Sequence, residues 1–170
     1  MQTRYSRRII CCTGFIILLL FLAATVAMAL NVGDAAPDFA VLDMQGIQKT
    51  LADYQGQVVI INFWASYCPP CRQEKPSMEQ LYQDKKDKGL KVLAVSGEKK
   101  RKVARYLKKY PLSFDVLRDI DGVTHRTYGV LSYPQSFVMD RDGTVAHIFF
   151  GPQDWTGLLV SEVLTPLLAE

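Results

Sequence analysis

The stretch VVIINFWASYCPPC, residues 58–71, joins a continuous apolar run to two cysteines that stand three residues apart. Residues 58–64 are β-branched or aromatic apart from Asn62, and such a run is typical of a strand buried on both faces of a parallel or mixed sheet. Residues 71–86 then have helical composition. The cysteine pair is therefore predicted to lie at the junction of a buried strand and a helix.

Two cysteines in this position suit reversible disulfide chemistry. One helical turn brings the sulfurs of Cys68 and Cys71 close enough to bond, and the positive end of the helix dipole stabilises a thiolate. Cys68, the outer residue, is expected to attack, and Cys71 to resolve the mixed disulfide. Pro69 and Pro70 preset the turn but have no N–H to donate to Cys68. We therefore expect a less stabilised thiolate, and a more reducing pair, than in a strong oxidant.

Two other uses of the pair fit the sequence less well. A structural disulfide across so short a loop would stabilise little, because the entropic gain grows with loop length. A zinc site would need two further ligands, and the two histidines, His125 and His147, are distant in sequence. Cys11 and Cys12 lie in an apolar N-terminal run, where they are interpreted as small apolar residues.

The rest of the chain predicts alternating strands and helices. We expect a hairpin over 39–42 and 47–50, a strand over 90–96, an amphipathic helix over 99–110, a short strand over 114–117, a helix capped by Asp121 and reaching Tyr128, a second hairpin over 135–139 and 144–150, and a closing helix striped by Trp155, Leu158, Leu159, Val163 and Leu167.

The N-terminus has the pattern of a segment that is inserted into a membrane. Three arginines occur in the first eight residues, and residues 9–30 then contain no charge and are long enough to span a bilayer. The basic flank would stay inside and send the following domain outward. Residues 1–30 are therefore a signal-anchor in the cell membrane, or a signal peptide cleaved after Ala29. We expect one folded domain over residues 31–170, facing the periplasm or the outside.

The charge balance bears on the partners of this domain. The formal net charge is +3, which the three N-terminal arginines account for, so the remainder of the chain is neutral. Nucleic acid is not an expected partner, because a basic footprint is needed to match its phosphates. One predicted helix is nonetheless strongly basic, and it is either a solvated face or a surface for an acidic partner or lipid headgroups; its cations are Lys99, Lys100, Arg101, Lys102, Arg105, Lys108 and Lys109.

Residues 63–71, FWASYCPPC, with Pro76 five residues after the second cysteine, resemble the TlpA/ResA branch of membrane-associated thioredoxin-like proteins. The resemblance covers roughly residues 31–168. It implies an α/β domain of thioredoxin-like fold, with a central mixed sheet flanked by helices. It also implies an extra N-terminal β-hairpin and a helical insertion around residues 99–110.

The resemblance also implies roles for residues outside the cysteine pair. Tyr133-Pro134 matches the family's cis-proline, which lies against the cysteines and helps to hold the partner's backbone. Glu98 matches an acid near the active site and would handle the proton of Cys71; the alternative is a solvated glutamate at a helix start. Trp64 resembles a tryptophan that packs beneath the site, with simple core packing as the alternative. Tyr67 departs from the tryptophan usual before the first cysteine, so partner preference is in doubt. Partner contact would then involve Trp64, Tyr67, Pro69, Pro70, Tyr133 and Pro134.

Relatives of this kind reduce disulfides outside the cytoplasm, commonly those of apocytochrome c during cytochrome c maturation. Their electrons usually come from a membrane thiol transporter of the DsbD/CcdA kind, and no cofactor or metal is expected. A disulfide oxidase or isomerase on the same fold stays open, because reduction potential decides the direction. A peroxiredoxin is disfavoured by Ala65 and Ile61, where its threonine or serine and its proline would stand. A copper-binding assembly factor of the Sco type would need one more residue between the cysteines.

Overall fold

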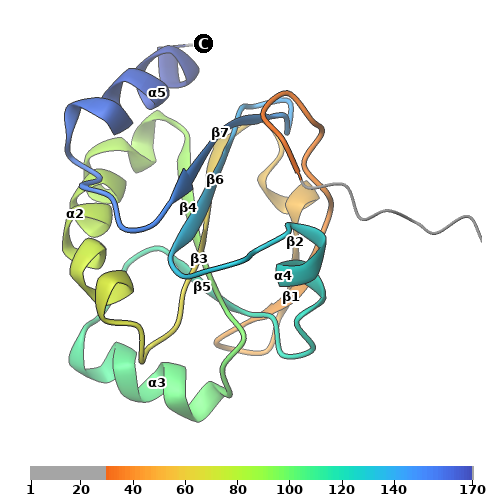
Figure 1. The fold of residues 1–170 in the computed structure, drawn as a ribbon, viewed down its shortest axis with the longest axis vertical. Helices are drawn as coiled ribbons and strands as arrows, with labels where there is room; N and C mark the ends of the chain where they lie inside the picture. The colour runs from red at the N-terminus through yellow and green to blue at the C-terminus, as the bar shows by residue number, and fades with distance from the viewer. Residues whose placement is uncertain (1–29, 170) are drawn as a thin grey trace, which may run out of the picture.

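The structure, a computed structural model, describes residues 30–169. Its elements follow one another as a hairpin, two strand–helix units, a short strand and helix, a second hairpin and a closing helix (Figure 1). They are β1 (Ala40–Asp43), β2 (Gln48–Thr50), η1 (Leu51–Tyr54), β3 (Val58–Phe63), α2 (Pro69–Lys85), η2 (Lys86–Lys88), β4 (Leu90–Ser96), α3 (Lys100–Lys109), β5 (Asp115–Arg118), α4 (Val123–Thr127), β6 (Gln135–Met139), β7 (Val145–Phe150) and α5 (Leu158–Ala169). This order is the one expected from the sequence.

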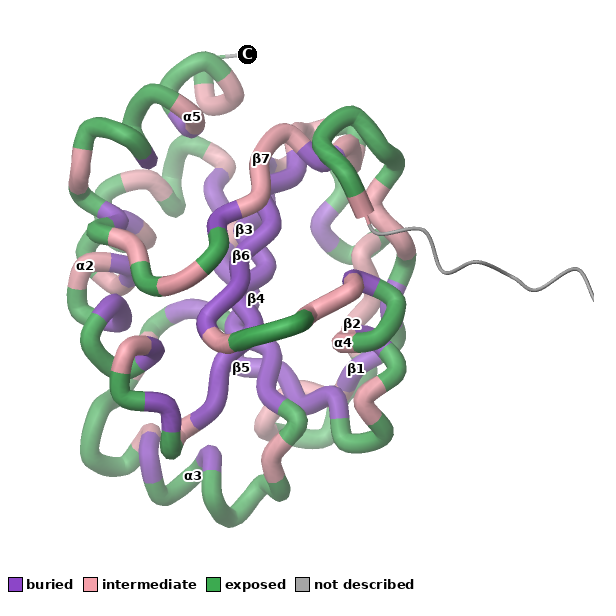
Figure 2. The backbone as a smooth tube through the Cα atoms, viewed as in Figure 1, coloured by how far each residue is buried: buried purple, intermediate pink, exposed green. Residues whose placement is uncertain are grey.

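The strands within residues 30–169 form one mixed sheet in the order β2-β1-β5-β4-β3-β6-β7. β3, β4 and β5 run parallel, whereas β1, β6 and β7 are antiparallel to the strands that they join. In β3, Ile60 pairs with Val92 of β4 on one side and with Val138 of β6 on the other. All of β3 is buried (Figure 2), which confirms the prediction of a strand covered on both faces.

The two faces of the sheet bury separate apolar clusters, because successive strand residues point to opposite sides. Ile60 and Val92 face a cluster that includes Val103 of α3, Met78 of α2 and Val160 of α5. The opposite face packs against the residues before β1, η1 and the region around α4. Its buried residues include Phe39, Val41, Tyr54, Ile61, Leu93, Leu117, Tyr128 and Phe137. The cysteines belong to the first cluster, on the side of α2, α3 and α5.

The closing helix differs from its prediction in both start and register. α5 begins at Leu158, so Trp155 lies in the turn before it, although its ring is 1% exposed. Leu158 and Leu159 are 83% and 56% exposed, so the predicted stripe is wrong at these two positions. The buried residues are Val160 and Leu164, with Val163, Leu167 and Leu168 partly buried beside them. The predicted stripe takes its helical phase from Trp155, which precedes the helix, so positions counted from it do not match the buried face.

Two other boundaries also shift. α2 begins at Pro69, two residues before the predicted start, because Pro69 and Pro70 occupy its first turn. The helix expected after Asp121 is the short α4. Two residues, Asp121 and Asp119, accept hydrogen bonds from its first N–H groups. Asp121 Oδ1 accepts a hydrogen bond from the Val123 N–H (3.1 Å), whereas Asp119 accepts those of the next two residues. Asp119 is thus the larger contributor to this helix start, which the sequence prediction missed.

The expected membrane segment, residues 9–30, lies outside the described residues except for its last position. Among residues 30–169, no helix combines the length and the apolar character that crossing a bilayer requires.

Candidate active site

The cysteine pair lies where the loop after β3 enters α2. Cys68 and Cys71 form a disulfide with their Cα atoms 5.3 Å apart. Cys68 is the N-cap residue of α2 and 8% exposed, whereas Cys71 is fully buried one turn further on. The two sulfurs therefore differ in access: a partner reaches Cys68 first, which is the order expected for an attacking and a resolving thiol.

The turn between the cysteines limits the hydrogen bonds to sulfur. Pro69 and Pro70 fill the first two helical positions and have no N–H. The Cys71 N–H is therefore the first donor available, and it points to the Cys68 Sγ at 3.2 Å. The Arg72 N–H bonds instead to the carbonyl oxygen of Cys68 (3.2 Å). In the part of the chain that the structure describes, one backbone N–H thus contacts the outer sulfur.

The surface around Cys68 is aromatic and proline-rich. Tyr67 is 67% exposed, Pro69 is exposed, and Pro70 is half-buried. The Tyr133–Pro134 peptide bond is cis, as the resemblance implied, and Tyr133 lines a hollow together with Tyr67. Residues from two distant parts of the chain, which the sequence analysis had grouped as partner contacts, are thus brought to one rim.

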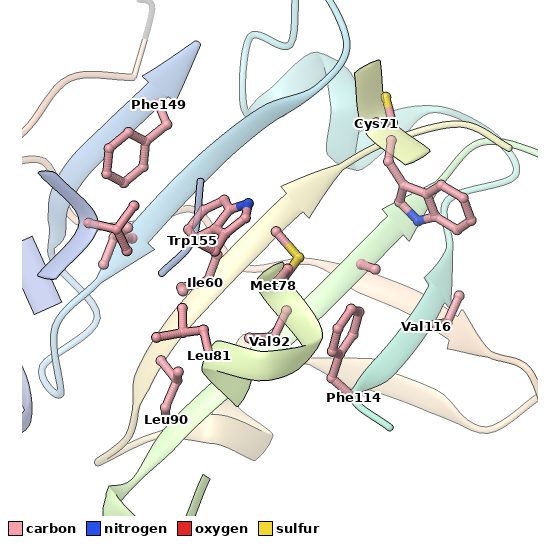
Figure 3. Close-up of a cluster of buried hydrophobic side chains, with 14 of the residues drawn as sticks. Ile60, Cys71, Met78, Leu81, Leu90, Val92, Phe114, Val116, Phe149 and Trp155 are labelled. Atoms are coloured by element: carbon pink, nitrogen blue, oxygen red, sulfur yellow. The ribbon is translucent and has the colours of Figure 1, made fainter. Parts of the chain in front are cut away.

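Trp64 differs from the other residues in that group, because it is fully buried. It packs in the same cluster as both cysteines, and its ring centroid is 4.9 Å from that of Tyr106 in α3. Figure 3 shows Cys71 at one end of this cluster, with Met78 and Trp155 further along it. In this state Trp64 supports the site from below and offers no surface to a partner.

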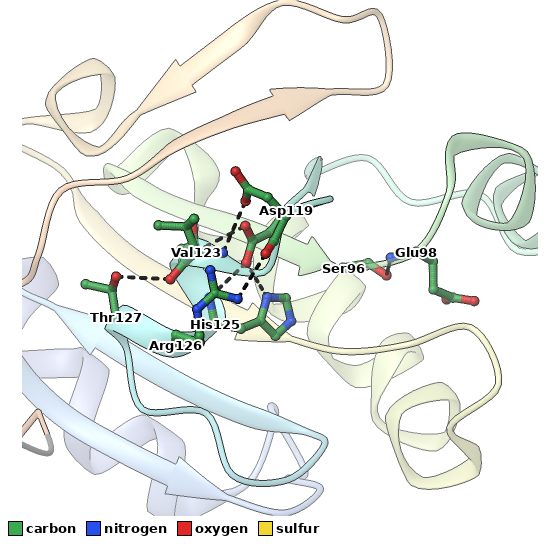
Figure 4. Close-up of polar contacts among 9 residues, drawn as sticks. Ser96, Glu98, Asp119, Val123, His125, Arg126 and Thr127 are labelled. Carbon is green, nitrogen blue, oxygen red and sulfur yellow. Dashed lines mark hydrogen bonds and ion pairs between the residues drawn. The ribbon is translucent and has the colours of Figure 1, made fainter. Parts of the chain in front are cut away.

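Glu98 lies beside the site but is held by Ser66. Its carboxylate accepts hydrogen bonds from the Ser66 N–H (2.5 Å) and the Ser66 hydroxyl (3.0 Å), two residues before Cys68. The Glu98 N–H donates in turn to the Ser96 hydroxyl (3.3 Å; Figure 4). Glu98 therefore fixes the loop that leads into Cys68, and within residues 30–169 the hydrogen bonds of its carboxylate go to this loop and not to either sulfur.

A buried polar network, which the sequence analysis missed, lies beneath the cysteines. Asn62 in β3 donates to Glu74 Oε1 (2.8 Å) and to the Ser136 hydroxyl of β6 (2.8 Å), and it accepts a hydrogen bond from Lys75 Nζ. Glu74 Oε2 accepts from the Gln153 N–H (3.1 Å) and from the Trp155 indole N–H (3.3 Å). Glu74 and Lys75 are each 2% exposed. We call Asn62, Glu74 and Lys75 the buried network.

The electrostatics of the buried network follow from its removal from water. Burial raises the pKa of Glu74, while the charge of Lys75 and the hydrogen bonds to Glu74 act in the opposite direction. Burial likewise lowers the pKa of Lys75 to about 8, against the opposing effect of Glu74. The Lys75 ammonium also lies 5.0 Å from the centroid of the Trp64 ring. Both charges are thus less stable here than in water, and each depends on the other.

The sequence contained a signal for this network. Glu74 and Lys75 follow Cys71 by three and four residues, and Met78 follows it by seven, so all four share one side of α2. Cys71 and Met78 are both fully buried. Two charged residues between two core positions on one helix stripe indicate buried charges that need polar partners, and this spacing would have found them.

A second acid–base pair lies on the opposite face of the sheet. His125 Nδ1 and Asp119 Oδ2 are 2.5 Å apart (Figure 4), and the His125 ring packs on Phe63 and Tyr133. Burial acts to raise the pKa of Asp119, but the hydrogen bonds from His125 and Thr124 outweigh it and lower that pKa. Among residues 30–169, no group of three or more histidine, cysteine or acidic side chains is arranged to hold a metal ion.

Comparisons with known proteins give this geometry a context. The chain matches the AhpC/TSA family over residues 32–157. It is 37% identical over 147 residues to the thiol-disulfide oxidoreductase ResA of Geobacillus thermodenitrificans, a match covering 80% of this chain and 84% of the relative. It is 41% identical over 123 residues to the thioredoxin-like protein YneN of Bacillus subtilis, covering 70% and 71%. A Chlorobium tepidum crystal structure described as thiol:disulfide interchange protein DsbE superposes with a TM-score of 0.77 at 38% identity, over 82% of this chain and 99% of that one.

The chain belongs to the ResA-like thiol-disulfide oxidoreductases of the AhpC/TSA family. The thioredoxin-like fold expected from residues 63–71 is confirmed, and the chain is an enzyme of thiol–disulfide exchange. The names of the relatives assign no roles to single residues. The roles of Cys68, Cys71 and Glu98 in this ResA-like enzyme, and the partner contacts around them, therefore stay predictions.

Proposed function

We propose that this enzyme reduces protein disulfides outside the cytoplasm, with apocytochrome c as a client during cytochrome c maturation. The observation that carries the proposal is the turn at Cys68, where a single backbone N–H contacts the outer sulfur. Fewer donors stabilise a thiolate less, and a less stabilised thiolate favours the reducing direction. The unusually charge-free run over residues 9–30 supports attachment to the inner or cytoplasmic membrane, or export with cleavage after Ala29.

The proposed reaction has two exchange steps. The Cys68 thiolate attacks one sulfur of the client's disulfide, that S–S bond breaks, and a client thiolate leaves. The Cys71 thiolate then attacks the Cys68 sulfur, which releases the second client thiol and closes the Cys68–Cys71 disulfide. The client gains two electrons and two protons. A membrane dithiol of the DsbD/CcdA kind is the proposed donor that reduces the enzyme again.

Two carboxyl groups lie near the cysteines for proton exchange. Glu98 is the group expected from the resemblance. It is hydrogen-bonded to Ser66, which precedes Cys68 by two residues. Glu74 is one turn from Cys71 along α2, and its raised pKa lets it keep a proton closer to neutral pH. The variants Glu98→Gln and Glu74→Gln distinguish the two groups. Only the variant that removes the proton partner of Cys71 is expected to shift the pH profile of the second step, the attack of Cys71 on the Cys68 sulfur.

The test of direction is the equilibrium reduction potential of the Cys68–Cys71 pair, measured on the full-length protein in detergent. Thioredoxin lies near −270 mV and the strong oxidant DsbA near −120 mV. A value at or below that of thioredoxin is expected. A value close to that of DsbA would reverse the direction and make the chain a disulfide oxidase or isomerase on the same fold.

A further inference from the structure

The basic residues of α3, and Lys99 directly before it, are exposed and form no ion pair with other residues of 30–169. Seven cations occur between positions 99 and 109 without an intervening acid, and each of them is exposed. Within residues 30–169, none of the seven forms an ion pair or a side-chain hydrogen bond; Lys109 alone contacts an aromatic ring, that of Tyr110. Like charges along one helix repel one another, so this helix gains no stability from them. The cations are Lys99, Lys100, Arg101, Lys102, Arg105, Lys108 and Lys109.

Each end of α3 borders a hollow that is lined by a neighbour of Cys68 in the chain, Tyr67 in one and Pro69 in the other. At its N-terminal end, Lys99 and Lys102 line a hollow of about 410 Å³ together with Tyr67 and Tyr133. At its C-terminal end, Lys109 and Tyr110 line a hollow of about 650 Å³ that also includes Pro69, Arg72, Tyr106, Pro111 and Leu112. Figure 1 shows α3 running beneath the start of α2, where the cysteines lie. The two hollows thus flank the cysteine turn, with the basic helix between them.

Both hollows contain one acid, and in both the acid is already bound. Glu98, in the smaller hollow, accepts two hydrogen bonds from Ser66. Glu79, in the larger one, accepts from the N–H and hydroxyl of Ser113 and from Gln83. Lys75 also lines the larger hollow and is bound to Asn62, whereas Lys99, Lys102 and Lys109 have no such partner in the described chain. The charged groups of both hollows that have no partner in the described chain are therefore cationic, and tyrosine side chains line both hollows beside them.

We propose that the two hollows and the α3 face between them dock an acidic, extended segment of the thiol partner, which lies across Cys68. This inference rests on the proposed function and names the class of partner that the site selects. Lys102, Arg105 and Lys109 follow one another at i, i+3 and i+7, so they form one stripe that spans roughly 10 Å. An extended segment covers that distance in about three residues. The partner's acids therefore stand about three or four residues apart, on either side of the reacting cysteine.

The probe is the disulfide-linked dimer of a short synthetic peptide with one cysteine. One version carries Asp two residues before and two residues after the cysteine, and the matched version carries Asn at both positions. Reduced full-length protein in detergent is mixed with each, and the rate of peptide reduction is followed. We expect the Asp peptide to react about tenfold faster at 20 mM salt, and this advantage to shrink to about twofold at 500 mM.

Two triple variants locate the effect. Lys102→Gln, Arg105→Gln and Lys109→Gln together remove the stripe and are expected to abolish most of the Asp advantage. Lys85→Gln, Lys86→Gln and Lys88→Gln remove the same charge at the far end of α2 and its following turn, and are expected to preserve the advantage. The ratio of the two peptide rates is compared within each protein, so a general change in cysteine reactivity cancels.

Each result decides. Equal rates for the Asp and Asn peptides, or equal losses in the two triple variants, overturn the docking proposal while leaving a disulfide reductase intact. Failure to reduce either peptide overturns the proposed reductase activity instead. The ratio of the Asp and Asn peptide rates is then measured for oxidised protein with the reduced peptides, which tests docking alone. The ratio is also measured in neutral vesicles and in vesicles rich in phosphatidylglycerol. An Asp advantage in both supports the acidic segment, whereas its loss in the second means that lipid headgroups occupy the stripe at an anionic membrane, which overturns the acidic segment as its occupant there.

Discussion

Lys75 and the cations of α3 carry the same charge on neighbouring helices, but they sit in opposite surroundings. Lys75 is 2% exposed and binds Asn62 beside a carboxylate, whereas Lys102 and Lys109 are exposed and form no ion pair or side-chain hydrogen bond in the described chain. Removal from water makes the first charge depend on its neighbours for stability. The exposed cations of α3 are stabilised by water and not by the fold, so they can bind a partner.

The difference teaches where stability and recognition reside in this enzyme. The buried network links β3, α2, β6 and the turn before α5, so it connects most of the elements beneath the cysteines. α3 contributes Val103 and Tyr106 to the core and presents its cations outward. A change in the network should therefore alter unfolding, whereas a change in the stripe should alter partner choice. The following predictions test this division, from the largest effect to the smallest.

Glu74→Ala should have the largest effect on stability. It leaves the Lys75 ammonium buried without its countercharge, and the N–H groups of Gln153 and Trp155 without their acceptor. Leaving a buried charge without compensation costs about 3–5 kcal/mol of unfolding free energy. Urea unfolding at pH 7 measures this loss of unfolding free energy. The comparison is Lys108→Ala at an exposed position of α3, for which a change within about 0.5 kcal/mol is expected. A loss below 1 kcal/mol for Glu74→Ala, on the same scale, would contradict the role given to the network.

The sequence predicted the fold well because its strongest signals are local. The run over β3 is buried on both faces, and Asp142-Gly143 forms the turn of the second hairpin with Gly143 at a φ of +83°. The cysteine pair was found because its spacing carries the chemistry. These features depend on neighbouring residues alone, and the three-dimensional arrangement did not override them.

The sequence prediction failed where distant segments meet. Trp155 was placed in a helix on its spacing, but its indole N–H bonds to Glu74, 81 residues earlier, and the chain turns there instead. Glu74 and Lys75 were passed over as ordinary helix residues, because their partners Asn62 and Ser136 are contributed by other strands. The His125–Asp119 contact is local in sequence and is a different case: Asp119 lies before the predicted cap at Asp121, so neither this contact nor the cap that Asp119 provides is expected from the pattern.

The second prediction concerns the pH dependence of stability. The pKa of Lys75 is about 8 in the folded protein and 10.5 for an ordinary lysine. Between these values the unfolded chain holds a proton that the folded protein lacks, so this group makes the unfolding free energy rise with pH. The raised pKa of Glu74 acts in the other direction, lowering stability as pH rises above its ordinary value of 4.5.

Lys75→Met isolates the lysine's part. We expect the difference in unfolding free energy between wild type and variant to change by up to about 3 kcal/mol between pH 8 and 10.5, in the direction that favours wild type at high pH. Urea midpoints at pH 7, 8, 9 and 10 give the two curves. The buried tyrosines titrate equally in both proteins and cancel. Parallel curves would mean that Lys75 keeps an ordinary affinity for its proton.

The smallest effect is expected from the exposed helix. Lys100→Gln with Lys108→Gln removes two cations of α3 outside the stripe of Lys102, Arg105 and Lys109. Because neither cation has a partner within residues 30–169, we expect the unfolding free energy to stay within about 0.5 kcal/mol of wild type. Any gain should appear at 20 mM salt and vanish at 500 mM, since it comes from relieved repulsion. A loss above about 1.5 kcal/mol that persists at high salt would show that these cations support the fold. The buried network and α3 would then both contribute to stability, to different degrees, and fewer cations of α3 would be available to bind a partner.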